Sequence, residues 1–103
     1  MQSISLQAVP NQTLTILLAT QLTKLRIYTL LDGNLYMDVE VNAEAVVTGV
    51  LCRNSTVIVR DAYHGFIGDL SFVDTQGNND PVYSGLGSRY QLMYLSASDV
   101  AAL

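Results

Sequence analysis

The chain has 103 residues, which is enough for one domain and too few for two of ordinary size. Half of the residues are hydrophobic and only 14% are charged, against about 25% in a typical soluble domain, so the surface must be short of charge. The net charge of −4 repels phosphate, which argues against nucleic-acid binding, and no apolar run approaches the roughly 18 residues of a membrane-spanning helix.

Strand-forming segments begin near the amino terminus. Residues 1–5 lack the basic region and the apolar core of a secretion signal, so we expect the protein to stay in the compartment that makes it. Strands are predicted over residues 3–8 and 13–18, and residues 24–28 alternate polar and apolar side chains.

Residues 35–42 carry the clearest strand pattern. Every second side chain is apolar and the intervening ones are polar, which is typical of a strand with one buried face. The apolar members are Leu35, Met37, Val39 and Val41. The pair Asp32-Gly33 precedes this run and favours a tight hairpin turn, so residues 24–28 and 35–42 should pair antiparallel.

Further strands are predicted over residues 45–51, 56–60, 66–73 and 88–95, because β-branched and apolar residues dominate there between turn-forming residues. The fold class is therefore all-β: a single small antiparallel β-barrel or sandwich of about 7–8 short strands with little helix, over residues 1–95. Residues 96–103 form a short tail, which Ser96 or Ser98 could cap as one helical turn. We expect this tail to be frayed or docked on a neighbour.

The long connection over residues 74–87 breaks the alternating pattern. Loops of this length in compact domains are usually functional or disordered, and this one carries Pro81, Val82, Tyr83 and Leu86, which favour docking on another subunit. In the alternative, the loop folds back and plugs an open end of its own barrel.

Charged residues in apolar surroundings suggest an ion pair between Arg60 and either Asp61 or Asp69, which would fix strand register or a subunit contact. The predicted interface residues come from this cluster and from the long loop. They are Arg60, Asp61, Asp80, Pro81, Val82, Tyr83, Leu86 and Arg89.

Catalytic constellations are weak. His64 and Asp61 lack a nucleophile turn, and Asp69 and Asp74 are five residues apart, on opposite faces of one predicted strand. The acidic loop after Asp74 does not have calcium-loop spacing. We therefore predict no catalytic, cofactor-binding or metal-binding residues.

Two smaller features have plain structural interpretations. The single cysteine, Cys52, is expected to be a small buried side chain in a reducing cytosol. The sequence Gly85-Leu86-Gly87 precedes a strand rather than a helix, so it does not predict a phosphate-binding loop.

Several short blocks, in this order along residues 8–95, resemble the small baseplate plug proteins of contractile-tailed phages. The blocks are residues 10–14, 25–28, 49–54, 59–63, 65–70 and 80–90. The resemblance implies a small β-barrel-like domain in the central hub of the tail, near the tube and the spike, and it brings no catalytic residues with it.

The leading hypothesis is a structural baseplate protein that forms a ring or plug at the end of the tail tube. Its expected partners are its own copies, in three-fold or six-fold order, and baseplate, tail-tube or spike proteins. It would be assembled in the host bacterial cytoplasm and reside in the virion. The alternatives are a free-standing β-barrel module that binds a peptide or small ligand and, third, an enzyme using His64 and Asp61.

Overall fold

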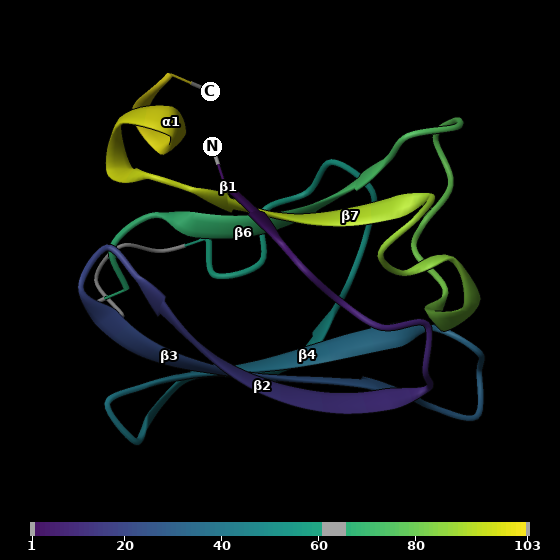
Figure 1. Cartoon of the computed structure of the whole chain (residues 1–103), viewed down its shortest axis with the longest axis horizontal. Coiled ribbons are helices and arrows are strands. Elements are labelled where there is room, and N and C mark those ends of the chain that lie inside the picture. The colour runs from purple at the N-terminus through teal and green to yellow at the C-terminus, as the bar shows by residue number, and fades with distance from the viewer. Residues whose placement is uncertain (1, 61–65, 103) are drawn as a thin grey trace.

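The computed structural model describes residues 2–60 and 66–102. In these residues seven strands form two antiparallel sheets that pack face to face (Figure 1). The strands are β1 (Gln2–Ile4), β2 (Asn11–Leu18), β3 (Gln21–Thr29), β4 (Leu35–Val41), β5 (Glu44–Leu51), β6 (Asp69–Asp74) and β7 (Tyr90–Leu95). The sheets do not close into a barrel, so the sandwich alternative of the predicted fold class is confirmed.

Strands β2 to β5 form a four-stranded meander in chain order. The predicted pairing of β3 with β4 is confirmed, with Ile27 opposite Met37. The connecting loop places Gly33 at a φ of +81°, and the N–H of Gly33 donates to the Leu30 carbonyl at 2.9 Å. Glycine is required there because other residues rarely adopt this backbone conformation.

The other two hairpins of this sheet have two-residue turns in which both residues have positive φ. These are Ala19 and Thr20 between β2 and β3, and Asn42 and Ala43 between β4 and β5. This is the turn geometry that matches the twist of paired strands, but it normally favours Gly and Asn. The β-branched Thr20, at a φ of +66°, is therefore strained.

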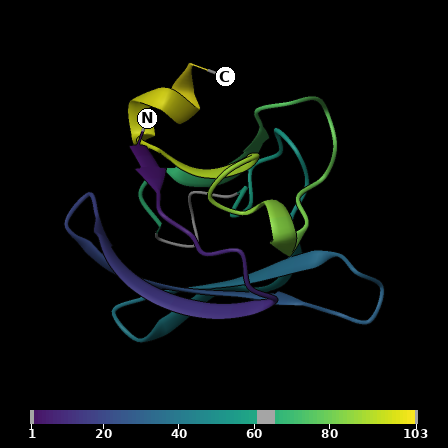
Figure 2. The ribbon, with the colours of Figure 1, turned by 45° about the vertical axis from the view of Figure 1, so that its right-hand side comes forward.

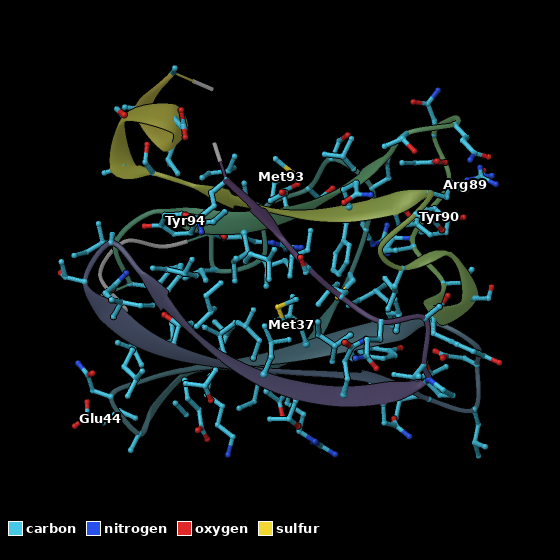
Figure 3. The ribbon with its side chains drawn as sticks, viewed as in Figure 1. Met37, Glu44, Arg89, Tyr90, Met93 and Tyr94 are labelled. Atoms are coloured by element: carbon cyan, nitrogen blue, oxygen red, sulfur yellow. The ribbon has the colours of Figure 1, made fainter. Side chains whose placement is uncertain are left out.

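The second sheet has the order β1-β7-β6. It lies over the inner face of the meander, and Figure 3 shows Met37 pointing from β4 into the space between the sheets. The core takes its largest fully buried side chains from both sheets and from the loop before β6. They include Phe66, Phe72, Leu18, Leu25, Ile27, Leu35, Met37, Leu70 and Leu92.

The predicted strand over residues 56–60 is wrong. This segment makes only one isolated bridge to β6, between Val57 and Ser71, and Arg60 ends it with a φ of +69°. The backbone N–H groups of residues 58–60 instead converge on the carboxylate of Asp69. A single acceptor collects donors that a regular strand would direct alternately to its two sides.

The first strand is also shorter than predicted, because residues 5–10 cross from one sheet to the other (Figure 1). The tail forms a short helix, α1 (Ala97–Ala101), and the predicted cap at Ser96 is confirmed. The Ser96 hydroxyl accepts from the Asp99 N–H, and the Asp99 carboxylate accepts from the Ser96 N–H. No helix within the described part of the chain is long and apolar enough to cross a membrane.

Candidate interaction surfaces

The loop between β6 and β7 is closed at its base by one carboxylate. The side chain of Asp74 is fully buried, and its two oxygens accept from Nε and Nη2 of Arg89 at 2.8 and 2.9 Å. The same oxygens accept the backbone N–H groups of Gln76 and Asn79. The Arg89 guanidinium is the main reason that the pKa of Asp74 lies well below its usual range. These bonds fix both ends of the loop.

The rest of this loop is built into the end of the sandwich. Asp80 accepts the Asn54 N–H through Oδ1 at 3.0 Å, and Pro81 and Leu86 are buried. Gly87, at a φ of +80°, lies so close to the Leu6 carbonyl that a Cβ would collide with it. The loop thus folds back over its own domain, as the alternative interpretation describes, and Pro81 and Leu86 are not available to a partner.

Between these buried anchors, Val82 and Tyr83 remain exposed, at 39% and 38%. Tyr83 begins the short 3-10 helix η2 (Tyr83–Gly85). The β3–β4 loop lies at the same end of the molecule as η2 (Figures 1 and 2). It exposes Leu30 by about half and Leu31 completely. We call Leu30, Leu31, Val82 and Tyr83 the apolar end.

Exposed large apolar side chains also occur at the β2–β3 hairpin. Leu17 and Leu22 face each other across the two strands, and they are 64% and 54% exposed. They flank the strained turn at Ala19 and Thr20. The pair could not be predicted from the sequence, because Leu17 lies within an uninterrupted apolar run. Such a run shows neither which side chain is buried nor where the sheet ends.

Arg60, a predicted interface residue, uses its backbone N–H rather than its guanidinium to reach Asp69, at 2.8 Å. Its Nε donates to the Val57 carbonyl at 3.1 Å. Asp69 itself is buried and also accepts the N–H groups of Ile58 and Val59. Asp61, the other predicted partner, lies outside the described residues. The Asp69 carboxylate therefore stabilises a loop. The only sequence signal for this role is an aspartate isolated in an apolar run.

The outer face of the meander carries a polar cluster centred on Asp38. Its carboxylate accepts from Arg26 at 3.2 Å, from the Tyr28 hydroxyl at 3.1 Å and from the Gly49 N–H at 2.7 Å. The Arg26 guanidinium also lies over the Tyr28 ring, 4.4 Å from its centroid. Burial, together with Asp38, raises the pKa of Tyr28. A small open hollow here is lined by Lys24, Arg26, Asp38 and Glu40, which are opposite charges on neighbouring strands.

In the acidic loop, Asp74 accepts hydrogen bonds from Arg89 and from backbone N–H groups, and Oδ1 of Asp80 accepts the Asn54 N–H. Within residues 2–60 and 66–102 no three side chains of metal-binding type lie together. Asp69 and Asp74 lie at the two ends of β6. His64 belongs to the segment that the structure does not describe. The carboxylates of Asp69, Asp74 and Asp80 thus stabilise loops of the fold.

A protein-family model described as "Cyanophage baseplate Pam3 plug gp18" matches residues 1–97. No curated protein matches the chain. The match covers both sheets and the closed β6–β7 loop, which is nearly the whole domain. The chain therefore belongs to the family of cyanophage baseplate plug proteins, and it is a structural protein of the phage tail baseplate.

Proposed function

We propose that this protein forms a ring or plug at the end of the tail tube, near the spike, and that it acts through protein contacts without catalysis. Its copies surround the tail axis in three-fold or six-fold order, and it is assembled in the host bacterial cytoplasm. The observation that carries the proposal is the apolar end, where two loops at the same end of the fold expose Leu30, Leu31, Val82 and Tyr83.

The apolar end is suited to a permanent contact. Large apolar side chains gathered on one part of a surface mark interaction sites more often than single exposed ones do. The loop that carries Val82 and Tyr83 is already fixed by Asp74, Arg89 and Asp80. Little conformational freedom is lost when such a loop docks, which favours binding. A tyrosine between buried anchors is also a typical hot-spot residue.

The absence of catalysis is proposed because the buried carboxylates have structural partners. Asp69 accepts backbone N–H groups, and Asp74 is bound by Arg89. Burial also raises the pKa of the Cys52 thiol to about 12, which keeps this nucleophile protonated and unreactive.

The test is incorporation of variants into phage tails. Tails are purified from phage that carry Leu31→Ser together with Tyr83→Ala, and the amount of this protein per tail is measured by quantitative mass spectrometry. Cryo-electron microscopy of the same tails locates its density. Val73→Ser is the matched control, because Val73 is 37% exposed but lies on β6 and outside the apolar end.

We expect the double variant to fold with a nearly unchanged melting temperature and to be lost from tails, while Val73→Ser is incorporated normally. Normal incorporation of the double variant would remove the role of the apolar end. Density away from the end of the tail tube would refute the proposed position. An isolated monomer that binds a peptide and is dispensable for tails would favour the free-standing binding module.

A further inference from the structure

The two sheets differ in how their edges are protected. In the three-stranded sheet, β1 has only three residues, and the outer edge of β6 makes isolated bridges to Asn54 and Val57. The four-stranded sheet ends in β2 on one side and in β5 on the other, and each has eight residues. Long edge strands are templates for pairing with another chain unless charge, proline or a covering segment protects them.

Strand β2 has a regular edge. It pairs with β3 through eight consecutive residues without a shift, and it contains no charged residue and no proline. The Asn42 N–H donates to the Leu22 carbonyl, so the backbone N–H and C=O groups of Leu22 point toward β4. Those of the alternate residues of β3 point toward β2. The N–H and C=O groups of Thr13 and Thr15 therefore point away from β3, toward the open edge.

Both edge strands leave apolar side chains incompletely covered, because three strands lie over four. Seven apolar side chains pack against the core while remaining only partly buried, and five of them belong to β2 or β5. These five are Leu14, Ile16, Val46, Val47 and Val50. A strand added at each edge would extend the sheet beyond these side chains and shield them from water.

Strand β5 has the properties that a partner for β2 requires. The meander alternates direction over four strands, so β5 runs opposite to β2, and copies placed in the same orientation bring them together as an antiparallel pair. Glu44 is the only charge on β5. Its register shifts against β4 mark bulges, which bend and twist a strand. Such bending curves a sheet that must continue around an axis.

We infer that the β2 edge of one copy pairs antiparallel with the β5 edge of the next copy, so that the four-stranded sheets join head to tail. This inference rests on the proposed ring, and it names the surface by which a second copy binds. Head-to-tail contacts of this kind generate closed rings when the rotation between copies closes.

Two proline variants block the two edges separately. Thr15→Pro removes an N–H that points to the open edge of β2, and proline is tolerated at such positions of edge strands. Ala45→Pro does the same for β5, because Glu44 flanks the two-residue turn and pairs with Val41, which leaves the Ala45 N–H pointing outward. The matched controls Thr15→Val and Ala45→Thr keep both N–H groups.

Each protein is purified, its fold is checked by circular dichroism and thermal melting, and its assembly is measured by native mass spectrometry over a range of concentrations. We expect the unmodified chain and the controls to form a closed oligomer, and each proline variant alone to be monomeric. An equal mixture of the two variants should give dimers and nothing larger. Thr15→Pro keeps only its β5 edge and Ala45→Pro keeps only its β2 edge, so one copy of each can pair once and no free edge is left.

Several outcomes would overturn the inference. They are a monomeric unmodified chain at every concentration, oligomers that persist in folded Thr15→Pro, and a mixture that stays monomeric. Dimers of Ala45→Pro alone would also overturn it, because they would indicate pairing of β2 with itself. Tails purified from phage that carry these variants distinguish a failure of the edge pairing from a failure of the proposed function. If folded Thr15→Pro is incorporated at the tube end in normal amounts, the edge pairing is wrong and the plug role stands; if the unmodified chain is absent from the tube end, the plug role is wrong.

Discussion

Replacing Asp69 by alanine tests whether one carboxylate holds residues 58–60 in place. The side chain is buried and accepts the N–H groups of Ile58, Val59 and Arg60 at 3.1, 2.7 and 2.8 Å. Ile58 keeps a second acceptor, the Leu70 carbonyl at 2.9 Å, and the exposed Arg60 can turn to water. The N–H of the buried Leu70 also donates to Oδ1 of Asp69, at 2.7 Å. The N–H groups of Val59 and Leu70 would both be left without an acceptor.

The expected cost follows from these four donors. Each of the two buried donors left unsatisfied costs about 1–3 kcal/mol, and the Arg60 bond that is exchanged for water contributes roughly 0.5–1.5 kcal/mol. Asp69→Ala should therefore lower the free energy of unfolding by about 3–7 kcal/mol, a large share of the roughly 5–15 kcal/mol of a typical domain.

Asp69→Asn should fall between the alanine variant and the unmodified chain. Its amide oxygen can replace Oδ1 and keep Val59, whereas its NH2 group then faces the N–H of Arg60, and two donors cannot bond. Urea unfolding followed by far-ultraviolet circular dichroism measures both variants, with Glu44→Ala as an exposed carboxylate control. A loss below about 1 kcal/mol for Asp69→Ala, within the range of ordinary surface substitutions, would refute this account of the carboxylate.

Three further predictions concern single features. Gly33→Val should lower the melting temperature more than Asn34→Ala, because φ at Gly33 is +81°. No atom lies within 4 Å of an added Cβ, so the cost of about 1–2 kcal/mol comes from backbone conformation and not from a clash. Equal melting temperatures of the two variants would contradict the prediction. The thiol of Cys52, with a pKa of about 12, should react with a thiol reagent at pH 8 only after unfolding, and rapid reaction of the folded chain would show that it is accessible. Because Arg89 lowers the pKa of Asp74 below its usual value of 3.8, the contribution of this pair to stability is complete above pH 3.8 and is lost as the pH falls below it. Arg89→Gln should therefore weaken the dependence of the free energy of unfolding on pH, measured by urea titrations between pH 6 and pH 2. An unchanged pH dependence would contradict the prediction.

The meander could be predicted from the sequence because its signals are local. Residues 35–42 alternate strictly, and the turn at Gly33 needs a residue that tolerates positive φ. The strand predicted at residues 56–60 failed for a non-local reason, since its N–H groups bind Asp69 from the next strand. Periodicity shows which side chains share a face, but it does not give the order of strands in a sheet. The choice between barrel and sandwich therefore required the structure.

The candidate surface was only half predictable. The apolar residues of the long loop marked it correctly as ordered, but a loop has no period that separates inward from outward side chains. Pro81 and Leu86 point into the domain, and Val82 and Tyr83 remain exposed. Leu30 and Leu31 join them only because the β3–β4 loop lies at the same end of the fold, which is a tertiary relation between segments some 50 residues apart along the chain.

The position of β7 between β1 and β6 has a consequence for synthesis. The hairpins of the meander can form while the chain is still emerging from the ribosome, because their contacts are local. The sheet that covers them cannot form until residues 90–95 have been made, since β1 and β6 bind only through that strand. Until then, Leu25, Ile27 and Met37 lack their cover, and a nascent chain cannot present the finished sandwich. A chain cut before β7 should therefore aggregate rather than fold into a smaller domain.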